Sequence, residues 1–359
     1  MTGSWSLARS VERIERLCAS TLGERDLRVG IVAELRRSLG FDAYAWLLTD
    51  PVTSVGSNPV AEVPALSALP TVIKLKYSSP INRWTTFAGP PHPVRLLSRT
   101  AADPLDPWRA MLTGYGIVDV ASTVCRDRHG TWAFLDLWRD GTSGPFTDDE
   151  VAVLVAAGST ITTAVRRRLA GTFLAPAASV PRDEGPAVLI LDDALCITGQ
   201  TVAATAWLQR LLPTTPGMAP IPAAAYNVAA QLIAVEAGAD DHPASARTHV
   251  PGFTWVTVRA SRLAASGTSG PGAIAVSIEE TPGAERRDVY ARSHAFSPRE
   301  HRLVRLLARG LDTHELAEAM SISDYTVGDH LKSIFARTGL NSRHAVLTAA
   351  LGASTEPPA

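Results

Sequence analysis

The stretch FSPREHRLVRLLARGLDTHELAEAMSISDYTVGDHLKSIFARTGL, residues 296 to 340, contains three short amphipathic patterns with helix caps between them. A fourth pattern, RHAVLTAAL, follows at residues 343–351. Four capped helices within about 60 residues predict a compact helix-turn-helix unit. The predicted caps and helix ends are Ser297 with Pro298 and Glu300, Asp312 with Glu315, Ser323, Asn341 or Ser342, and the glycines Gly310 and Gly339.

The third of these helices has the outline of a helix that enters a DNA groove. Its spacing directs Val327, Leu331 and Ile334 inward and leaves the remaining side chains on or near an outer face. Asp329 stands three residues before Lys332, where it can pair with that lysine or accept from a cytosine amino group. The residues predicted to bind DNA are Ser323, Tyr325, Thr326, Val327, Gly328, Asp329, His330, Lys332, Ser333 and Arg337.

The charge of this region is nearly balanced. Residues 295–352 hold seven basic and six acidic side chains, a net of +1, while the whole chain of 359 residues has a formal net charge of -1. A DNA site must therefore be local. Arg302, Arg305 and Arg309 give the first helix one basic face. The weak charge keeps an alternative open, in which the unit is a protein-interaction adapter that has lost DNA binding.

The same region resembles the LuxR-type helix-turn-helix family. The resemblance implies a DNA-binding domain over residues 293–353 and double-stranded DNA as partner, with Lys332 and Arg337 at basic positions of the family. Gly328 departs from the long or basic residue that is usual there. The matching residues are Pro298-Arg299-Glu300, Gly310, Glu315-Leu316-Ala317, Ile322-Ser323, Thr326-Val327, His330-Leu331, Ile334-Phe335 and Gly339-Leu340.

A dimer is expected, because one helix in one major groove contacts only a few base pairs. Two copies on DNA half-sites about 34 Å apart would contact enough base pairs for useful affinity. Two apolar seams are candidates for this contact. One is residues 151–169, and the other is formed by Val346, Leu347, Ala350 and Leu351.

Residues 10–170 predict a helical segment, then a sheet, and then a long final helix. FDAYAWLLTD predicts a strand, Asp127–Gly130 predicts a hairpin turn, and Thr147 with Glu150 forms a capping box for the last helix. This order, with AFLDLWR followed by Phe146–Glu150, resembles a GAF domain. The cyclic-nucleotide signature of some GAF domains is not visible here.

Residues 171–186 are rich in small residues and proline and predict a linker, and residues 187–282 follow with strands and a helix. Asp192-Asp193 after an apolar strand suggests a phosphorylated receiver domain. A receiver also needs a lysine late in the domain, and there is none between Lys76 and Lys332. The segment instead resembles a PAS-like domain.

Aromatic residues are concentrated in the first segment. Small-molecule pockets are typically aromatic with a few polar groups, although ordinary core packing explains the same residues. The candidate ligand-binding residues are Tyr44, Trp46, Trp84, Trp108, Trp132 and Trp138. Cys125 and His129 flank a turn and are not expected to bind metal, and no cofactor or catalytic motif is predicted.

The sequence thus predicts a multidomain α+β protein, with GAF-like and PAS-like α/β sensor domains followed by an all-α four-helix LuxR-type domain. The expected function is sequence-specific transcriptional regulation, with a small molecule or partner sensed by the N-terminal domains. A regulator that binds an acyl-homoserine-lactone-like signal is a further alternative. Because the three cysteines are scattered and no apolar segment is long enough to span a membrane, a cytoplasmic protein is expected.

Overall fold

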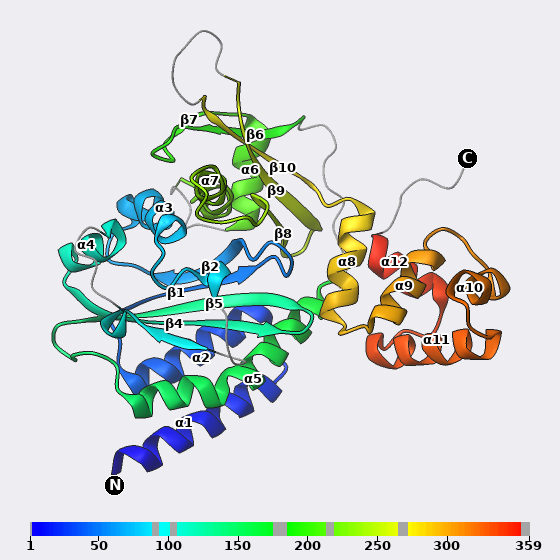
Figure 1. Ribbon diagram of the computed structural model, residues 1–359, viewed down its shortest axis with the longest axis horizontal. Coiled ribbons are helices and arrows are strands. Elements are labelled where there is room, and N and C mark those ends of the chain that lie inside the picture. The colour runs from blue at the N-terminus through cyan, green and yellow to red at the C-terminus, as the bar shows by residue number, and fades with distance from the viewer. Residues whose placement is uncertain are drawn as a thin grey trace. The chain divides into compact units, whose positions relative to one another are not determined.

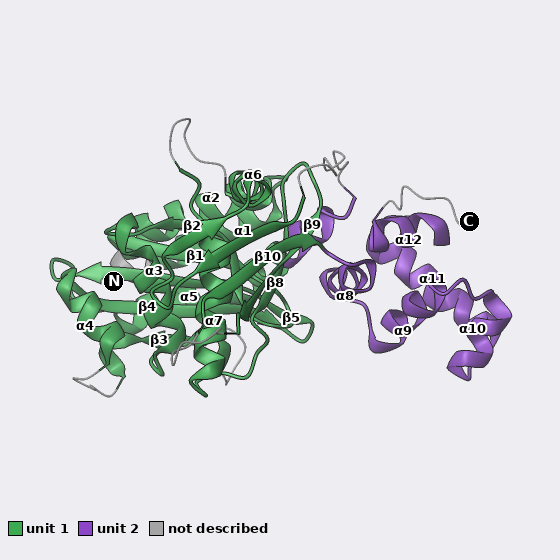
Figure 2. Ribbon diagram, turned by 90° about the horizontal axis from the view of Figure 1, so that it is seen from above, with its two compact units in different colours: residues 1–165, 177–280 green, residues 166–176, 281–359 purple. Residues whose placement is uncertain are grey.

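The computed structural model describes residues 2–87, 93–100, 106–174, 185–212, 219–264 and 272–352. They form two compact units, residues 1–165 with 177–280 and residues 166–176 with 281–359 (Figure 2). The first unit thus combines most residues of the two predicted sensor domains. Of the predicted linker at 171–186, residues 175–184 lie outside the described part of the chain. None of the described helices has the length and apolar character needed to cross a membrane.

The first half of this unit is built on a five-stranded antiparallel sheet of order β2-β1-β5-β4-β3. The predicted strand is β1, and the predicted hairpin joins β4 to β5, where Asp127 pairs with Gly130. Figure 1 shows α1, α2 and α5 on one side of this sheet and α3 on the other. The elements are α1 Thr2–Ala19, α2 Glu24–Leu39, β1 Ala43–Thr49, β2 Gly56–Glu62, η1 Leu66–Ala68, α3 Leu69–Ser78, η2 Trp84–Thr86, β3 Val94–Leu96, η3 Leu97–Arg99, α4 Pro107–Gly114, β4 Ile117–Asp127, β5 Gly130–Asp140 and α5 Asp148–Gly171.

The second half repeats this strand order. Its sheet has the order β7-β6-β10-β9-β8, which becomes 2-1-5-4-3 when its strands are numbered from one. The first sheet has the same order, so the two halves share one sheet topology. The elements are β6 Ala187–Leu191, β7 Ile197–Gln200, α6 Val202–Leu211, α7 Ala223–Glu236, β8 Ser245–His249, β9 Trp255–Arg262 and β10 Ile274–Glu280.

Helix α7 connects the two halves through a common core. It packs against α3 and β2 of the first half and against β9 of the second. One continuous apolar cluster contains Leu47 and Phe134 from the first sheet together with Val228 and Val256 from the second half. Nearly every residue of α7 is alanine or another apolar residue, so both of its sides can be buried.

A buried ion pair also joins the halves. The carboxylate of Asp50, at the end of β1, accepts from Arg247 Nε at 2.6 Å and from its NH2 group at 2.8 Å. The backbone N–H of Arg247 donates to the same carboxylate at 2.9 Å. Burial would raise the pKa of Asp50, but these contacts with Arg247 outweigh burial and lower it. The pair therefore fixes β8 against the first sheet.

The second unit is helical and contains the predicted four-helix arrangement, with one helix before it. Both capping boxes are present at Ser297 and Asp312, and Ser323 and Ser342 cap the last two helices. Gly339 ends the third of the four predicted helices in the left-handed conformation, with φ of 72°. The elements are α8 Gly283–Ser293, α9 Pro298–Leu307, α10 Thr313–Met320, α11 Asp324–Thr338 and α12 Arg343–Leu351.

Helix α12 offers only part of the apolar seam expected for dimerisation. It packs against α8, α9 and α11, and Val346 and Ala350 are almost completely buried, while Leu347 and Leu351 are half-buried. Helix α8 itself was not predicted, because GAERRDVYARS carries charged residues along most of its length. Only Val289, Tyr290, Ala291 and Ser293 are buried. With α8 absent from the prediction, the apolar face of α12 had no visible partner.

Candidate nucleic-acid interface and ligand pocket

Helices α10 and α11 form a helix-turn-helix in the second unit. The turn between them contains Ser321, which has φ of 56° and ends α10 in the left-handed conformation. Ser323 then begins α11, and its side chain accepts from the backbone N–H of Thr326 at 3.2 Å. Val327, Leu331 and Ile334 are buried, as their spacing predicts. The inner face of α11 is thereby fixed, and its opposite face is open.

The open face of α11 carries a strip of side chains at helical spacing. Tyr325 is 76% exposed, and Asp329, Lys332 and Ala336 follow it at intervals of three or four residues. Lys332 Nζ lies 3.2 Å from Asp329 Oδ1 and 5.8 Å from the centre of the Tyr325 ring. Because this ion pair is highly exposed, it contributes little to stability and leaves the ammonium accessible. The strip can present one positive charge and one aromatic ring to a ligand.

The other predicted DNA-binding residues have different surroundings. Val327 is completely buried, so it offers no side-chain surface to DNA. Thr326 and His330 are half-buried, and Ser323 is exposed. A Cβ at Gly328 would meet open space, so this glycine leaves a shallow place beside the strip. Ser333 is half-buried and donates to Glu300 Oε1 at 2.5 Å.

Glu300 holds α9 and α11 together. Its second oxygen accepts from the backbone N–H of Ser297 at 2.6 Å, and Arg337 Nε lies 3.7 Å from the first. Burial raises the pKa of Glu300, but the hydrogen bonds from Ser333 and Ser297 outweigh burial and lower it. One buried carboxylate therefore caps α9 and also positions α11.

A pocket of about 330 Å³ lies in the first unit, a size typical of small-molecule sites. Its floor is the face of the first sheet that carries Ala45, Leu47 and Asp136, and α3 forms one wall. The second half of the unit closes it with Leu212, Ile221, Ala223 and Asn227. Both predicted sensor segments therefore contribute to one pocket, whose lining is mostly apolar.

A buried ion pair lies in the pocket, and the exposed Arg25 is a further charged residue of the lining. Lys76 Nζ lies 2.9 Å from Asp136 Oδ2, and both side chains are at most 2% exposed. The ammonium also lies 4.8 Å from the ring centre of Trp84 and 5.2 Å from that of Trp108. Burial lowers the pKa of Lys76, and Asp136 opposes this change. Trp84 Nε1 donates to the other oxygen of Asp136 at 3.3 Å.

The structure brings together three of the six predicted ligand-binding aromatics. Trp84, Trp108 and Trp138 line the pocket. Tyr44 and Trp46 do not, because they alternate along β1 with the pocket residues Ala45 and Leu47 and so point to the opposite face of the sheet.

The sixth, Trp132, lies close to the β4–β5 hairpin. Its indole N–H donates to Asp127 Oδ1 at 3.0 Å.

Lys76, Asp136 and the contribution of α7 were not predicted from the sequence. A signal was available for Lys76, because it follows Val72 and Ile73 at helical spacing on the apolar face of α3. No comparable signal exists for α7, because an alanine-rich helix does not indicate which surface it covers.

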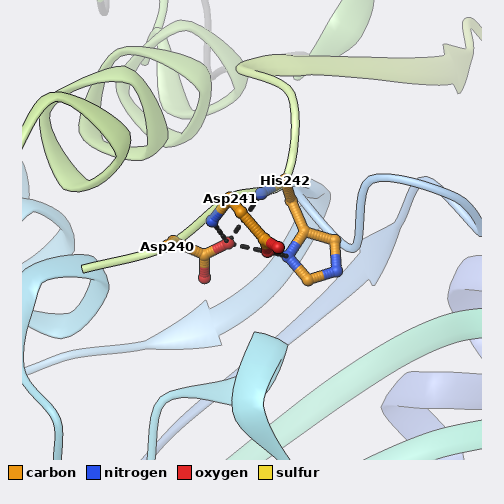
Figure 3. A group of neighbouring side chains, drawn as sticks. All are labelled: Asp240, Asp241 and His242. Atoms are coloured by element: carbon orange, nitrogen blue, oxygen red, sulfur yellow. Dashed lines mark hydrogen bonds and ion pairs between the residues drawn. The ribbon is translucent and has the colours of Figure 1, made fainter. Parts of the chain in front are cut away.

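A cluster of side chains of metal-binding type lies in the loop after α7, formed by Asp240, Asp241 and His242 (Figure 3). The Asp240 carboxylate accepts from the backbone N–H groups of Asp241 and His242 at 2.8 and 2.9 Å, from His242 Nδ1 at 2.7 Å, and from Thr85 Oγ1. Burial raises the pKa of Asp240, but its hydrogen bonds lower it to about 2. Its oxygens are occupied by contacts that hold the loop against η2.

Comparison with solved structures gives 40 matching chains, two of which are described here. One is SdiA in complex with octanoyl-rac-glycerol, at 13% identity and a TM-score of 0.34, with 97% of this chain and 93% of that chain covered. The other is Escherichia coli SdiA in a hexagonal crystal form, at 14% identity and a TM-score of 0.36, with 98% of each chain covered.

Comparison with curated proteins gives no match. Residues 294–350 match the sequence model of the GerE family, described as bacterial regulatory proteins of the luxR family. This matched range contains α9 to α11 and nearly all of α12. The four capped helices at the end of this chain are therefore a LuxR-family helix-turn-helix domain.

Proposed function

We propose that the protein is a sequence-specific DNA-binding transcriptional regulator, in which α11 enters the major groove. The observation that carries this proposal is the exposed strip on α11 within a LuxR-family domain. Tyr325, Lys332 and the half-buried Thr326 can contact phosphates or base edges. Arg337, at the end of α11, is 40% exposed and adds a second cation. Double-stranded DNA is the proposed partner, and a homodimer is proposed because one helix contacts few base pairs.

We further propose that the first unit senses a neutral, largely apolar small molecule in the pocket closed by α7. The apolar lining favours such a ligand, and a charged ligand would disturb the buried Lys76–Asp136 pair. The shared strand order of the two sheets supports the proposal that the halves are GAF-like and PAS-like domains. Ligand binding would shift the packing of the two halves and hence the spacing of the two recognition helices of a dimer.

The test of DNA binding is a salt titration of the full-length protein on a labelled duplex, with Lys332→Ala as the variant. A phosphate contact predicts that the variant binds more weakly and that its slope of log affinity against log salt is shallower by about one. Asp329→Asn is the matched control, because it removes the partner of Lys332 and keeps the ammonium. Equal affinity and slope for wild type and Lys332→Ala would contradict a phosphate contact by Lys332. No binding of the duplex by wild type would favour the adapter, which the local net charge of +1 also supports.

A further inference from the structure

A groove of about 500 Å³ lies within the second unit, where the last turn of α5 meets the ends of α8 and α11. Three arginines line it, Arg166 and Arg167 from α5 and Arg337 from α11. No acidic side chain is present among the described residues of its lining. The groove is therefore a concentration of positive charge in a domain whose total charge is nearly balanced.

Two of these arginines are held in place by backbone carbonyl groups. Arg166 donates from its NH1 group to the carbonyl of Ser293 at 3.0 Å, and Arg337 donates from its NH1 group to the carbonyl of Ala295 at 3.2 Å. A guanidinium has five N–H donors in a fixed plane, so one hydrogen bond to a carbonyl restricts the orientation of the whole group. Ser293 is the last residue of α8, where the helix dipole favours cations, and Ala295 follows two residues later.

Arg167 differs from the other two arginines. Its side chain is exposed, and within the described part of the chain it has no hydrogen-bond or ion-pair partner. Because the guanidinium of Arg167 has no such partner, it remains available to a ligand. Since Arg166 and Arg337 are already oriented, only Arg167 has to be ordered on binding.

The groove adjoins the exposed strip on α11. Ala336 is exposed, belongs to the strip and also lines the groove, and Arg337 and Thr338 follow it. A DNA strand that borders the major groove around α11 would bring a phosphate to this end of the helix.

We propose that the three arginines bind a phosphate group, that of the DNA backbone beside α11, so that the last turn of α5 forms part of the DNA interface. Planar guanidinium groups match phosphate oxygens, and the two arginines of α5 add positive charge that residues 295–352 lack. This inference rests on the proposed DNA-binding function. A free phosphate ion would be recognised by the same chemistry.

The experiment compares full-length wild type with Arg167→Ala in fluorescence anisotropy titrations on a labelled duplex of mixed sequence, at several salt concentrations. The expected result is roughly three- to tenfold weaker binding and a salt slope shallower by about one. Arg167→Lys should recover the slope because it keeps the charge. Arg128→Ala, in the exposed turn between β4 and β5, is the matched control and should bind as wild type does. Equal affinity and slope for Arg167→Ala and the control would contradict contact with the DNA backbone.

A second measurement distinguishes the source of the phosphate. Melting temperatures of wild type and Arg167→Ala are compared without DNA, as inorganic phosphate replaces chloride at constant ionic strength. If phosphate raises the melting temperature of wild type but not of Arg167→Ala, and the two proteins have the same salt slope on DNA, the groove binds free phosphate. If wild type binds no duplex, the proposed function fails, and the phosphate measurement alone decides whether the groove binds a phosphate group. No effect of Arg167→Ala in either measurement would overturn the inference.

Discussion

At the residue scale, Glu300 shows how one side chain positions the recognition helix. Its carboxylate completes the cap of α9 and accepts from Ser333 on α11. Glu300→Gln should destabilise these helices by about 1–2 kcal/mol, because a neutral amide cannot accept the same charge-assisted hydrogen bonds. Amide hydrogen exchange of α9 and α11 in the full-length protein measures this loss, and unchanged protection would contradict the role given to Glu300.

The pH dependence of this loss follows from the lowered pKa of Glu300. The folded state holds the carboxylate more strongly than the unfolded chain does. The contribution is therefore complete above the unfolded pKa of about 4.3 and is lost as the pH falls through the folded pKa. Wild type and Glu300→Gln should converge in stability at acid pH. A difference in stability between the two proteins that stays constant down to acid pH would contradict this explanation.

The buried pair of Lys76 and Asp136 makes a second prediction at this scale. Lys76→Met leaves a buried carboxylate without its cation and should cost about 3–5 kcal/mol of unfolding free energy. Lys76→Met combined with Asp136→Leu removes both charges and should recover much of that loss. Chemical denaturation of the three proteins, followed by tryptophan fluorescence, tests the coupling. Additive losses in the double variant would show that the two charges do not stabilise each other.

At the element scale, two glycines of the same helical region provide a matched test. Gly328 has a helical backbone conformation and open space around its missing Cβ, so Gly328→Ala should stabilise α11 by about 0.5–1 kcal/mol. Gly339 also has open space but φ of 72°, so Gly339→Ala should destabilise by about 1 kcal/mol. Thermal unfolding of both variants checks the signs. Equal effects of the two substitutions would contradict the assignment of the end of α11.

The sequence was most informative where structure is determined locally. Caps such as Ser297 and Asp312 and the hairpin at Asp127–Gly130 depend on neighbouring residues, and the structure confirms them. Helix α7 and the apolar face of α12 depend on surfaces that are distant in sequence, so the burial of Val346 and Ala350 was not predicted. The pocket was only partly predictable, since alternation along β1 places Tyr44 and Trp46 on the other face, but nothing local indicated which face bears the pocket.

At the scale of the whole molecule, the two halves of the first unit should unfold together, because they share α7, one apolar core and the Asp50–Arg247 pair. Arg247→Met leaves Asp50 buried without a partner and should cost about 3–5 kcal/mol. Hydrogen exchange should then accelerate equally in β5 of the first sheet and β9 of the second. Faster exchange confined to residues 187–280 would show that the halves fold independently.

The central claim is that the exposed face of α11 reads DNA. The most direct measurement is capture of fragmented genomic DNA by the full-length protein, with Lys332→Ala processed in parallel. We expect enrichment of a two-fold-related site by wild type, weaker capture by the variant, and loss of binding as salt is raised. Capture of no sequence above background by wild type would contradict the claim and favour a protein partner for the same exposed strip.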